Sequence, residues 1–198
     1  MHKPDSKALK RRTGKLSRLA MACLGFMVSL LGPASGFGGE PPLTQYQVEA
    51  VFLFNFAKYV DWPPAAFTNA TAPITIGVLG TDPFGDSLQH VAEGKTINGR
   101  PVTIRHLVSD SELGGCQILY ISSSENFRVG QILGKAGALP ILTVGESELF
   151  VANGGIINFV LKGGKVRLEI NLAPAKKNGL DISSHLLAVA DVVRGKSD

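Results

Sequence analysis

Residues 74–79 have the sequence ITIGVL, a short run that is almost wholly apolar. Such a run is typical of a parallel strand buried on both faces of a sheet, because helices cover both faces. Further strand-like runs follow at 102–106, 116–121, 140–144 and 156–161, and helix-forming segments separate most of them. Among these segments are one that Asp82-Pro83 opens and that runs to about Ala92, and a short one at 147–151. This alternation predicts parallel pairing with right-handed crossovers. We therefore expect an α/β fold with a mostly parallel, doubly wound (Rossmann/flavodoxin-like) sheet of about six strands.

The C-terminal part of the chain departs from this alternation. Lys162-Gly163-Gly164-Lys165 is a tight turn, so the strand that follows it, 166–172, must be antiparallel to its predecessor. One or two helical turns are expected over 173–178. A final amphipathic helix is expected to begin at Ser183 or Ser184 and to include Val193. The sheet is thus predicted to end in an antiparallel hairpin.

Upstream of the first strand, residues 46–62 (YQVEAVFLFNFAKYVDW) predict a long helix that Pro63-Pro64 ends. Thr44 is its expected N-cap, with Gln47 at the capping-box position. The helix is apolar almost all the way round, so it must be buried on two sides. Glu49 is expected to reach solvent near the open first turn. The stripe predicted to pack on the sheet consists of Leu53, Phe56 and Val60. The side predicted to contact a partner or a second copy of the chain consists of Val51, Phe54, Asn55, Lys58 and Trp62. For Trp62, burial within the monomer is the favoured alternative.

The N-terminal residues predict export. Residues 1–36 contain seven Lys and Arg against one acid, and an apolar run at 19–31 follows the basic part. This is the pattern of a cleavable signal peptide, with cleavage after Ala34 or Gly36. We expect a signal peptide at 1–36, a flexible lead-in at 37–45 and a single α/β domain at 46–194. The remaining residues carry 13 basic and 15 acidic side chains, which argues against nucleic-acid binding.

Export into an oxidising compartment would favour paired cysteines. After cleavage only Cys116 remains, so an internal disulfide is excluded. We expect a buried thiol at the start of a core strand; an intermolecular disulfide or a redox sensor is the alternative.

Three predicted strands are followed by polar, turn-forming residues at the carboxyl edge of the sheet. Ligands of open α/β sheets bind at this edge, and serine hydroxyls ahead of a helix can hold an anion. Simple capping of the helix by serine is the favoured alternative. The candidate ligand-binding residues are Thr81, Asp82, Ser122, Ser123, Ser124 and Glu146.

Catalytic motifs are missing from the sequence. It contains neither a GxGxxG nor a GxxxxGK[ST] nucleotide motif, and no GxSxG elbow. His90, His106 and His185 are scattered without metal-ligand spacing. A hydrolase built from Ser123, His185 and Asp82 lacks support. We expect no enzyme, cofactor or metal.

The strand at 166–172 offers a possible recognition surface. By the two-residue period of a strand, Arg167, Glu169 and Asn171 share one face. A solvated or ion-paired face is the favoured interpretation, and a surface that binds a partner is the alternative.

Six motifs, in order along the chain, resemble the YfiR family. The resemblance spans about 48–193, nearly all of the predicted mature chain. The motifs are VEAVFLFNFAKYVDWP (48–63), VLGTDPFGDSL (78–88), GCQILYISSSE (115–125), GGIINFV (154–160), VRLEIN (166–171) and LDISSHLL (180–187).

This resemblance implies a periplasmic, non-enzymatic α/β regulator. Such proteins bind the periplasmic domain of an inner-membrane diguanylate cyclase and repress it, which lowers cyclic-di-GMP and restrains exopolysaccharide and biofilm formation. An outer-membrane lipoprotein can draw the repressor away. Some members carry cysteine pairs, and this chain departs from them in having Cys116 alone. The alternative function is a periplasmic small-ligand sensor.

Overall fold

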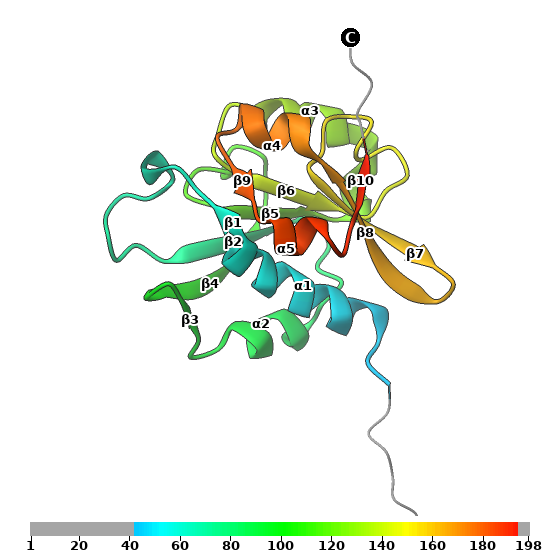
Figure 1. Ribbon diagram of the computed structural model, residues 1–198, viewed down its shortest axis with the longest axis horizontal. Helices are drawn as coiled ribbons and strands as arrows, with labels where there is room; N and C mark the ends of the chain where they lie inside the picture. Colours follow the sequence, from blue (N-terminus) through cyan, green and yellow to red (C-terminus); the bar gives the residue numbers. More distant parts are fainter. Residues whose placement is uncertain (1–41, 194–198) are drawn as a thin grey trace, which may run out of the picture. The chain divides into compact units, whose positions relative to one another are not determined.

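The computed structural model describes residues 42–193 (Figure 1). The predicted signal peptide and most of the lead-in lie outside the described residues. Within them, eight strands form one sheet in the order β10-β8-β7-β6-β5-β2-β4-β3. The strands are β2 (Ile74–Leu79), β3 (Thr96–Ile97), β4 (Arg100–Leu107), β5 (Ile118–Ile121), β6 (Leu142–Gly145), β7 (Ile157–Lys162), β8 (Lys165–Asn171) and β10 (Asp191–Val193).

Most neighbours in this sheet are parallel. The strands β4, β2, β5, β6 and β7 pair in parallel, and β10 is parallel to β8. The antiparallel pairs are β3 with β4, and β7 with β8, whose pairing ends at Lys162 and Lys165. The predicted mostly parallel α/β sheet is therefore confirmed. It has more strands than the expected six because the short strands β3 and β10 were not foreseen.

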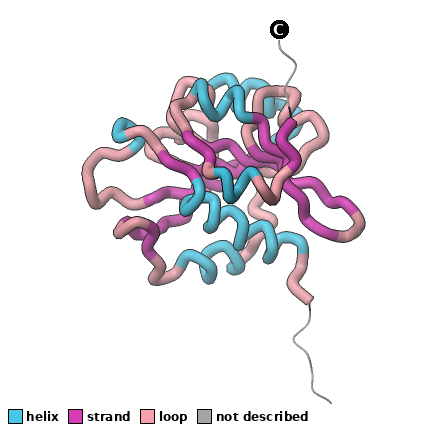
Figure 2. Tube along the Cα trace, viewed as in Figure 1, coloured by secondary structure: helices cyan, strands magenta, loops and turns pink. Residues whose placement is uncertain are grey.

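Helices cover both faces of the sheet (Figures 1 and 2). On one face lie α1 (Gln45–Tyr59), α2 (Asp86–Ala92) and the short α5 (Ser184–Leu187). On the other lies α3 (Val129–Ala136), which follows a 3-10 helix, η2 (Ser123–Arg128), and α4 (Leu172–Lys177) lies beside α3. All six residues of β2 are buried, as its apolar sequence predicted for a strand covered on both faces.

The first helix begins where the sequence indicates and ends early. Thr44 caps it through a complete capping box with Gln47. The helix ends at Tyr59, three residues before Trp62, because Val60 and Asp61 form a strand, β1, that pairs with β9 (Asp181–Ile182). A short 3-10 helix, η1 (Pro64–Ala66), follows.

Three helix predictions are wrong. The last helix ends at Leu187, because Asp191–Val193 add as a strand to the edge of β8 and β-branched valines suit that position. The second helix starts at Asp86, because the Asp82 side chain accepts a hydrogen bond from the Phe84 amide at 2.7 Å and forms a turn. The segment 147–151 forms turns without a helix.

Gln117, which is 3% exposed, links three separate segments at the start of β5. Its Oε1 accepts a hydrogen bond from the Thr75 amide at 2.8 Å, and its Nε2 donates to the Ala66 carbonyl at 2.6 Å. Its backbone carbonyl accepts a hydrogen bond from Trp62 Nε1 at 3.2 Å. The chain that follows α1 is thereby attached to the sheet.

The ring of Phe150 fills the space between two glycines. Phe150 is 1% exposed and belongs to the apolar core between the sheet and α3. A Cβ atom added at Gly145 or at Gly155 would overlap its ring. Both positions therefore require glycine for close packing rather than for backbone flexibility.

Candidate functional site

The loops after β2 and β5 meet at the carboxyl edge, as the sequence predicted. The Thr81 amide donates a hydrogen bond to Ser124 Oγ at 2.9 Å. Ser122 Oγ in turn accepts from the Ser124 amide at 3.4 Å and caps η2. Asp82 Oδ2 lies 3.5 Å from Nδ1 of the exposed His106. These side chains are brought together, but several of their polar atoms bind the chain's own backbone.

Glu146 belongs to a different group, which we call the acidic cluster: Tyr46 and Glu49 on α1, Tyr120 on β5 and Glu146 after β6. Glu49 is 0% exposed, so the expectation that it reaches solvent is wrong. The reason is that aromatic rings close the first turns of α1. The Phe84 ring lies 6.0 Å from that of Tyr46 and 4.7 Å from that of Tyr120, measured between centroids.

Several oxygen atoms of the acidic cluster are buried without a hydrogen-bond partner. Glu49 Oε1 accepts from Gln45 Nε2 at 2.9 Å. Glu49 Oε2, Tyr120 Oη and Glu146 Oε1 are buried and have no partner of normal geometry. Buried polar atoms in proteins are nearly always paired, and the hydroxyls of Tyr46 and Tyr120 lie close enough to act on Glu146 as hydrogen-bond donors.

Burial dominates the electrostatics of the cluster. It raises the pKa of Glu49 to about 7, and the neighbouring Glu146 charge raises it further while the Gln45 hydrogen bond opposes the rise. The pKa of Tyr120 is also raised, first by burial and then by Glu146. The same two causes raise the pKa of Tyr46. The tyrosines therefore remain neutral, and Glu49 changes charge near neutral pH.

The raised pKa of Glu49 predicts that its ionisation destabilises the fold. The folded protein holds a proton that the unfolded chain releases near pH 4.5, so stability falls as the pH rises through about 7. Relative to Glu49→Gln, the wild-type protein should lose about 2 to 3 kcal/mol of unfolding free energy over this range. Urea unfolding of both proteins at several pH values measures this difference. If the difference in unfolding free energy between the two proteins does not change with pH, the prediction is wrong.

Two cavities flank the loop that begins with Glu146. One, of about 430 Å³, is bordered by Asn126, Val129 and Leu149; the other, of about 340 Å³, by Asn158, Phe159 and Glu169. Glu146, Ser147 and Glu148 line both cavities. Of the predicted ligand-binding residues, Glu146 alone lines them, and Thr81, Asp82 and Ser122–Ser124 do not.

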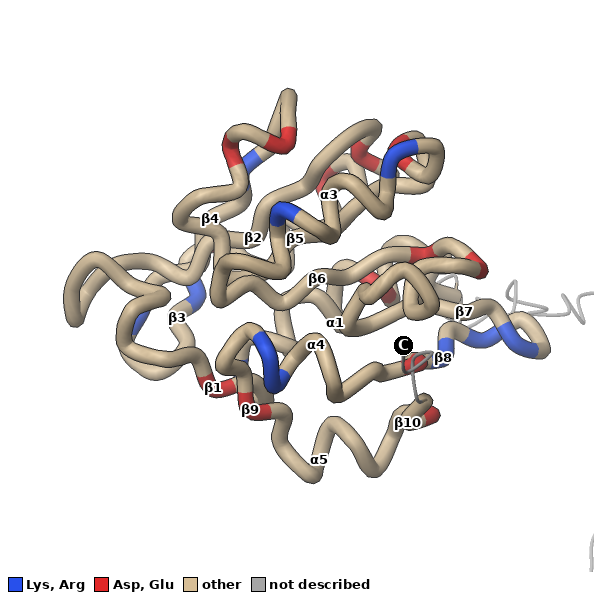
Figure 3. Tube along the Cα trace, turned by 90° about the horizontal axis from the view of Figure 1, so that it is seen from above, with Lys and Arg blue, Asp and Glu red and all other residues tan. Residues whose placement is uncertain are grey.

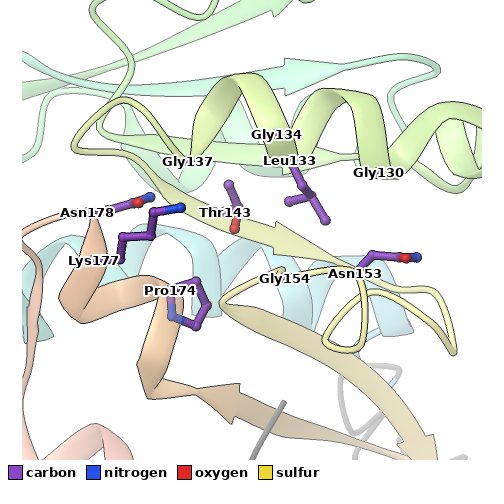
Figure 4. Close-up of a pocket in the computed structure, with 10 residues that line it drawn as sticks. All are labelled: Gly130, Leu133, Gly134, Gly137, Thr143, Asn153, Gly154, Pro174, Lys177 and Asn178. Carbon is purple, nitrogen blue, oxygen red and sulfur yellow. The ribbon is translucent and has the colours of Figure 1, made fainter. Parts of the chain in front are cut away.

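A third cavity, of about 230 Å³, lies between α3 and α4 (Figure 4). The glycines Gly130, Gly134 and Gly137 leave space along α3, and the Lys177 side chain extends from α4 toward Thr143 on β6. Thr143 Oγ1 accepts a hydrogen bond from the Ile156 amide at 3.1 Å. The sequence interpretation missed this cavity, although the glycine spacing on α3 signals an open helix face. The cavity has room for a small polar ligand.

The polar face of β8 is partly as predicted. Arg167 is exposed and Glu169 half-buried. Figure 3 shows basic and acidic positions close together where β7, β8 and β10 meet. Lys162 Nζ lies 3.4 Å from Glu169 and 3.1 Å from Asp191. Asn171 is 4% exposed, and its Oδ1 accepts a hydrogen bond from the Ala173 amide at the start of α4. Asn171 is therefore a helix cap and is not part of the exposed face.

The predicted contact side of α1 is also smaller than expected. Phe54 is 5% exposed, with Lys58 Nζ and Lys95 Nζ at 5.0 and 5.3 Å from its ring centroid. It is a core residue because α2 packs against this side of α1. Trp62 is half-buried. The residues of α1 that remain exposed or half-exposed on this side are Val51, Asn55, Lys58 and Tyr59.

Cys116 is a free thiol and is 3% exposed, and burial raises its pKa. Over residues 42–193, no group of three or more His, Cys, Asp or Glu side chains is placed to hold a metal ion. No helix in that range is long and apolar enough to cross a membrane.

Comparison with known proteins identifies a family. A solved structure with a similar fold is that of a conserved domain protein from Vibrio cholerae O1 biovar El Tor, with a TM-score of 0.50 and 13% identity. The match covers 75% of this chain and 60% of that protein, and at this identity it concerns the fold alone. No curated protein matches this chain. The model of the YfiR/HmsC-like family matches residues 46–191, and the chain therefore belongs to the YfiR/HmsC-like family.

Proposed function

We propose that this protein is an exported, non-enzymatic regulator that binds the periplasmic domain of an inner-membrane diguanylate cyclase and represses it. The observation that carries the proposal is the family match, which covers residues 46–191 and thus most of the described chain. The signal-like sequence at 1–36 supports export. Repression would lower cyclic-di-GMP and biofilm output, and an outer-membrane lipoprotein would be a second partner.

The face formed by β7, β8 and β10 is the contact surface that we assign to the cyclase. Arg167 is exposed and forms no ion pair among the described residues. Beside it, Lys162 forms ion pairs with Glu169 and Asp191. The unpaired guanidinium of Arg167 can pair with an acidic group of the partner, and the ion-paired neighbours lose less side-chain freedom on binding than free side chains would. The exposed side of α1, with Val51 and Lys58, is the second surface to test.

Deletion of the gene tests the function directly. We expect cyclic-di-GMP and biofilm to rise, and the wild-type gene to restore both. Cyclic-di-GMP is measured by mass spectrometry of cell extracts. Unchanged levels in the deletion strain would contradict the proposal.

A charge reversal tests the contact surface. Arg167→Glu should fail to restore repression and should reduce binding to the purified periplasmic domain at least about tenfold, because it reverses the charge with which this surface would complement the partner. Its melting temperature should stay unchanged, since Arg167 is exposed. Lys176→Glu, an exposed reversal on α4, is the matched control and should repress normally. Full repression by Arg167→Glu would place the contact elsewhere.

A small-ligand sensor is the second candidate function, and the cavity between α3 and α4 favours it. Lys177 could bind an anionic group there. Asn178 Oδ1 is buried without a partner, while its Nδ2 donates to the Ile141 carbonyl at 3.2 Å. Thermal-shift screening of small carboxylates and phosphates, with Lys177→Ala as the control, tests this candidate. If no compound shifts the melting temperature, only the regulator proposal remains.

A further inference from the structure

The cavity of about 340 Å³ beside β7, which we call the β7 cavity, brings together side chains from three segments. The loop after β6 contributes Glu146, Ser147 and Glu148, and the β7–β8 hairpin contributes Asn158 and Glu169. The strand register explains the arrangement on the hairpin. Asn158 on β7 lies opposite Glu169 on β8, so the two side chains share one face of the sheet.

Asn158 carries a buried acceptor at the wall of this cavity. The residue is 3% exposed, and its Oδ1 is buried without a hydrogen-bond partner among the described residues. Its neighbour on β6 is Gly145, which has no side chain to supply a donor. Ser147 Oγ on the loop is also buried and has no partner within residues 42–193. Because buried polar atoms are nearly always paired, a bound donor would satisfy both oxygens.

The charge of the lining indicates the charge of the ligand. Three carboxylates, those of Glu146, Glu148 and Glu169, line the β7 cavity, and none of the described Lys, Arg or His residues does. Lys162 pairs with Glu169 at 3.4 Å. Glu146 and Glu148 form no ion pair in the described part of the chain. A lining of one sign of charge attracts a ligand of the opposite sign, so this cavity favours a cation.

An organic cation suits the lining better than a metal ion does. A calcium ion takes about six to eight oxygen ligands, yet over residues 42–193 no group of three or more His, Cys, Asp or Glu side chains is placed to hold a metal. Phe159, Val160 and Leu161 add apolar surface to the cavity. An aliphatic chain packs on such a surface while its ammonium group stays among polar atoms, as a lysine side chain does.

We propose that the β7 cavity binds an aliphatic amine. An ammonium group donates hydrogen bonds to Asn158 Oδ1 and Ser147 Oγ, and its three N–H groups and positive charge match these acceptors and the carboxylates around them. The aliphatic chain lies along Val160 and Leu161. In a diamine, the second ammonium group pairs with Glu148. The volume is near the lower end of ligand pockets, about 300 to 1,000 Å³, so the ligand is small.

Calorimetric titration of the mature protein with the diamine putrescine tests this inference. No partner is needed, so its outcome is separate from that of the regulator proposal. We expect one binding site in about 0.15 M NaCl, which the uncharged diol of the same chain length does not occupy. Asn158→Leu removes the buried acceptor at similar volume and should raise the Kd at least about tenfold. Circular dichroism verifies that this variant is folded.

A pair of surface variants separates the site from the general charge of the protein. Glu148→Gln removes an exposed carboxylate of the cavity and should raise the Kd about threefold. Glu93→Gln removes an exposed carboxylate that does not line the cavity and is the matched control, with an unchanged Kd.

Chemical-shift mapping by NMR locates the bound amine. Amides of residues 146–149 and 157–162 should shift on addition of putrescine, and those of α2 should not. Absence of binding at up to about 10 mM putrescine, equal binding of the diol, or shifts spread over the whole surface would overturn the inference. A Kd that Glu93→Gln raises as much as Glu148→Gln does would overturn it too, since binding would then reflect net charge alone.

Discussion

Replacement of Phe54 by glutamate is expected to unfold the protein. Phe54 is 5% exposed and lies in the core that α1, α2 and the sheet share. Loss of a buried phenylalanine side chain costs about 3 to 5 kcal/mol, and the buried carboxylate adds a penalty of its own. The sum approaches the whole stability of a typical domain, about 5 to 15 kcal/mol. Circular dichroism with thermal melting should show loss of the cooperative transition.

Val51→Glu is the matched control for this experiment. Val51 lies on the same helix, one turn before Phe54, and is 39% exposed. An exposed substitution of this kind changes stability by about 0.5 kcal/mol or less, so the melting temperature should stay close to that of the wild type. If Val51→Glu melts normally but no longer binds the cyclase domain, the exposed side of α1 is part of the interface. A normal melt for Phe54→Glu would show that Phe54 is not a core residue.

The second large effect is expected at Gly155. A Cβ at this position would overlap the ring of Phe150, and Gly145 occupies the space beside the same ring. Since the ring is buried, it cannot move without disturbing the core against α3. Overpacking of this kind costs about 1 to 3 kcal/mol, and we expect Gly155→Ala to fall at the upper end. Urea unfolding measures the loss.

Two further variants identify the cause. Gly134→Ala adds the same methyl group in α3, where no atom beyond the adjoining helix backbone lies within 4 Å of it, and should stabilise the protein by about 0.5 to 1 kcal/mol. Phe150→Leu provides room for the methyl group, so the double variant Phe150→Leu/Gly155→Ala should be more stable than the sum of the single effects. Strict additivity would show that the ring is not the obstacle.

The part of the fold that sequence predicts well depends on local interactions. The apolar run 74–79 is a strand buried at every position. Thr44 and Gln47 form the expected capping box, because both partners lie within one turn of the chain. The turn residues after β7 likewise place β8 beside it in antiparallel pairing.

Two of the failures involve contacts between distant segments. Phe54 was predicted on the side of α1 that contacts a partner or a second copy, yet α2 covers it. Val193 was predicted to continue an amphipathic helical pattern, yet Asp191–Val193 pair with β8 as a strand at its open edge. Local propensity is a weak prior when a tertiary partner is available.

The candidate site was predicted only in part. The carboxyl edge was the expected place, and Glu146 lies there. The importance of Glu49 was missed, although a glutamate within an apolar helical stripe is itself a signal of a buried, perturbed carboxyl group. Its relation to Tyr120 and Glu146 could not be inferred, because the three residues come from separate elements that only the folded sheet brings together.

The attachment of Trp62 provides the molecule with an optical reporter. Trp62 is the only tryptophan of the chain, and its indole donates a hydrogen bond to the Gln117 carbonyl at the start of β5. Its emission therefore senses one defined junction, where the segment after the first helix joins the sheet. Detachment of that helix from the sheet would shift the emission to longer wavelength even while the rest of the sheet stays intact. Stopped-flow fluorescence can thus time this one event without any added label.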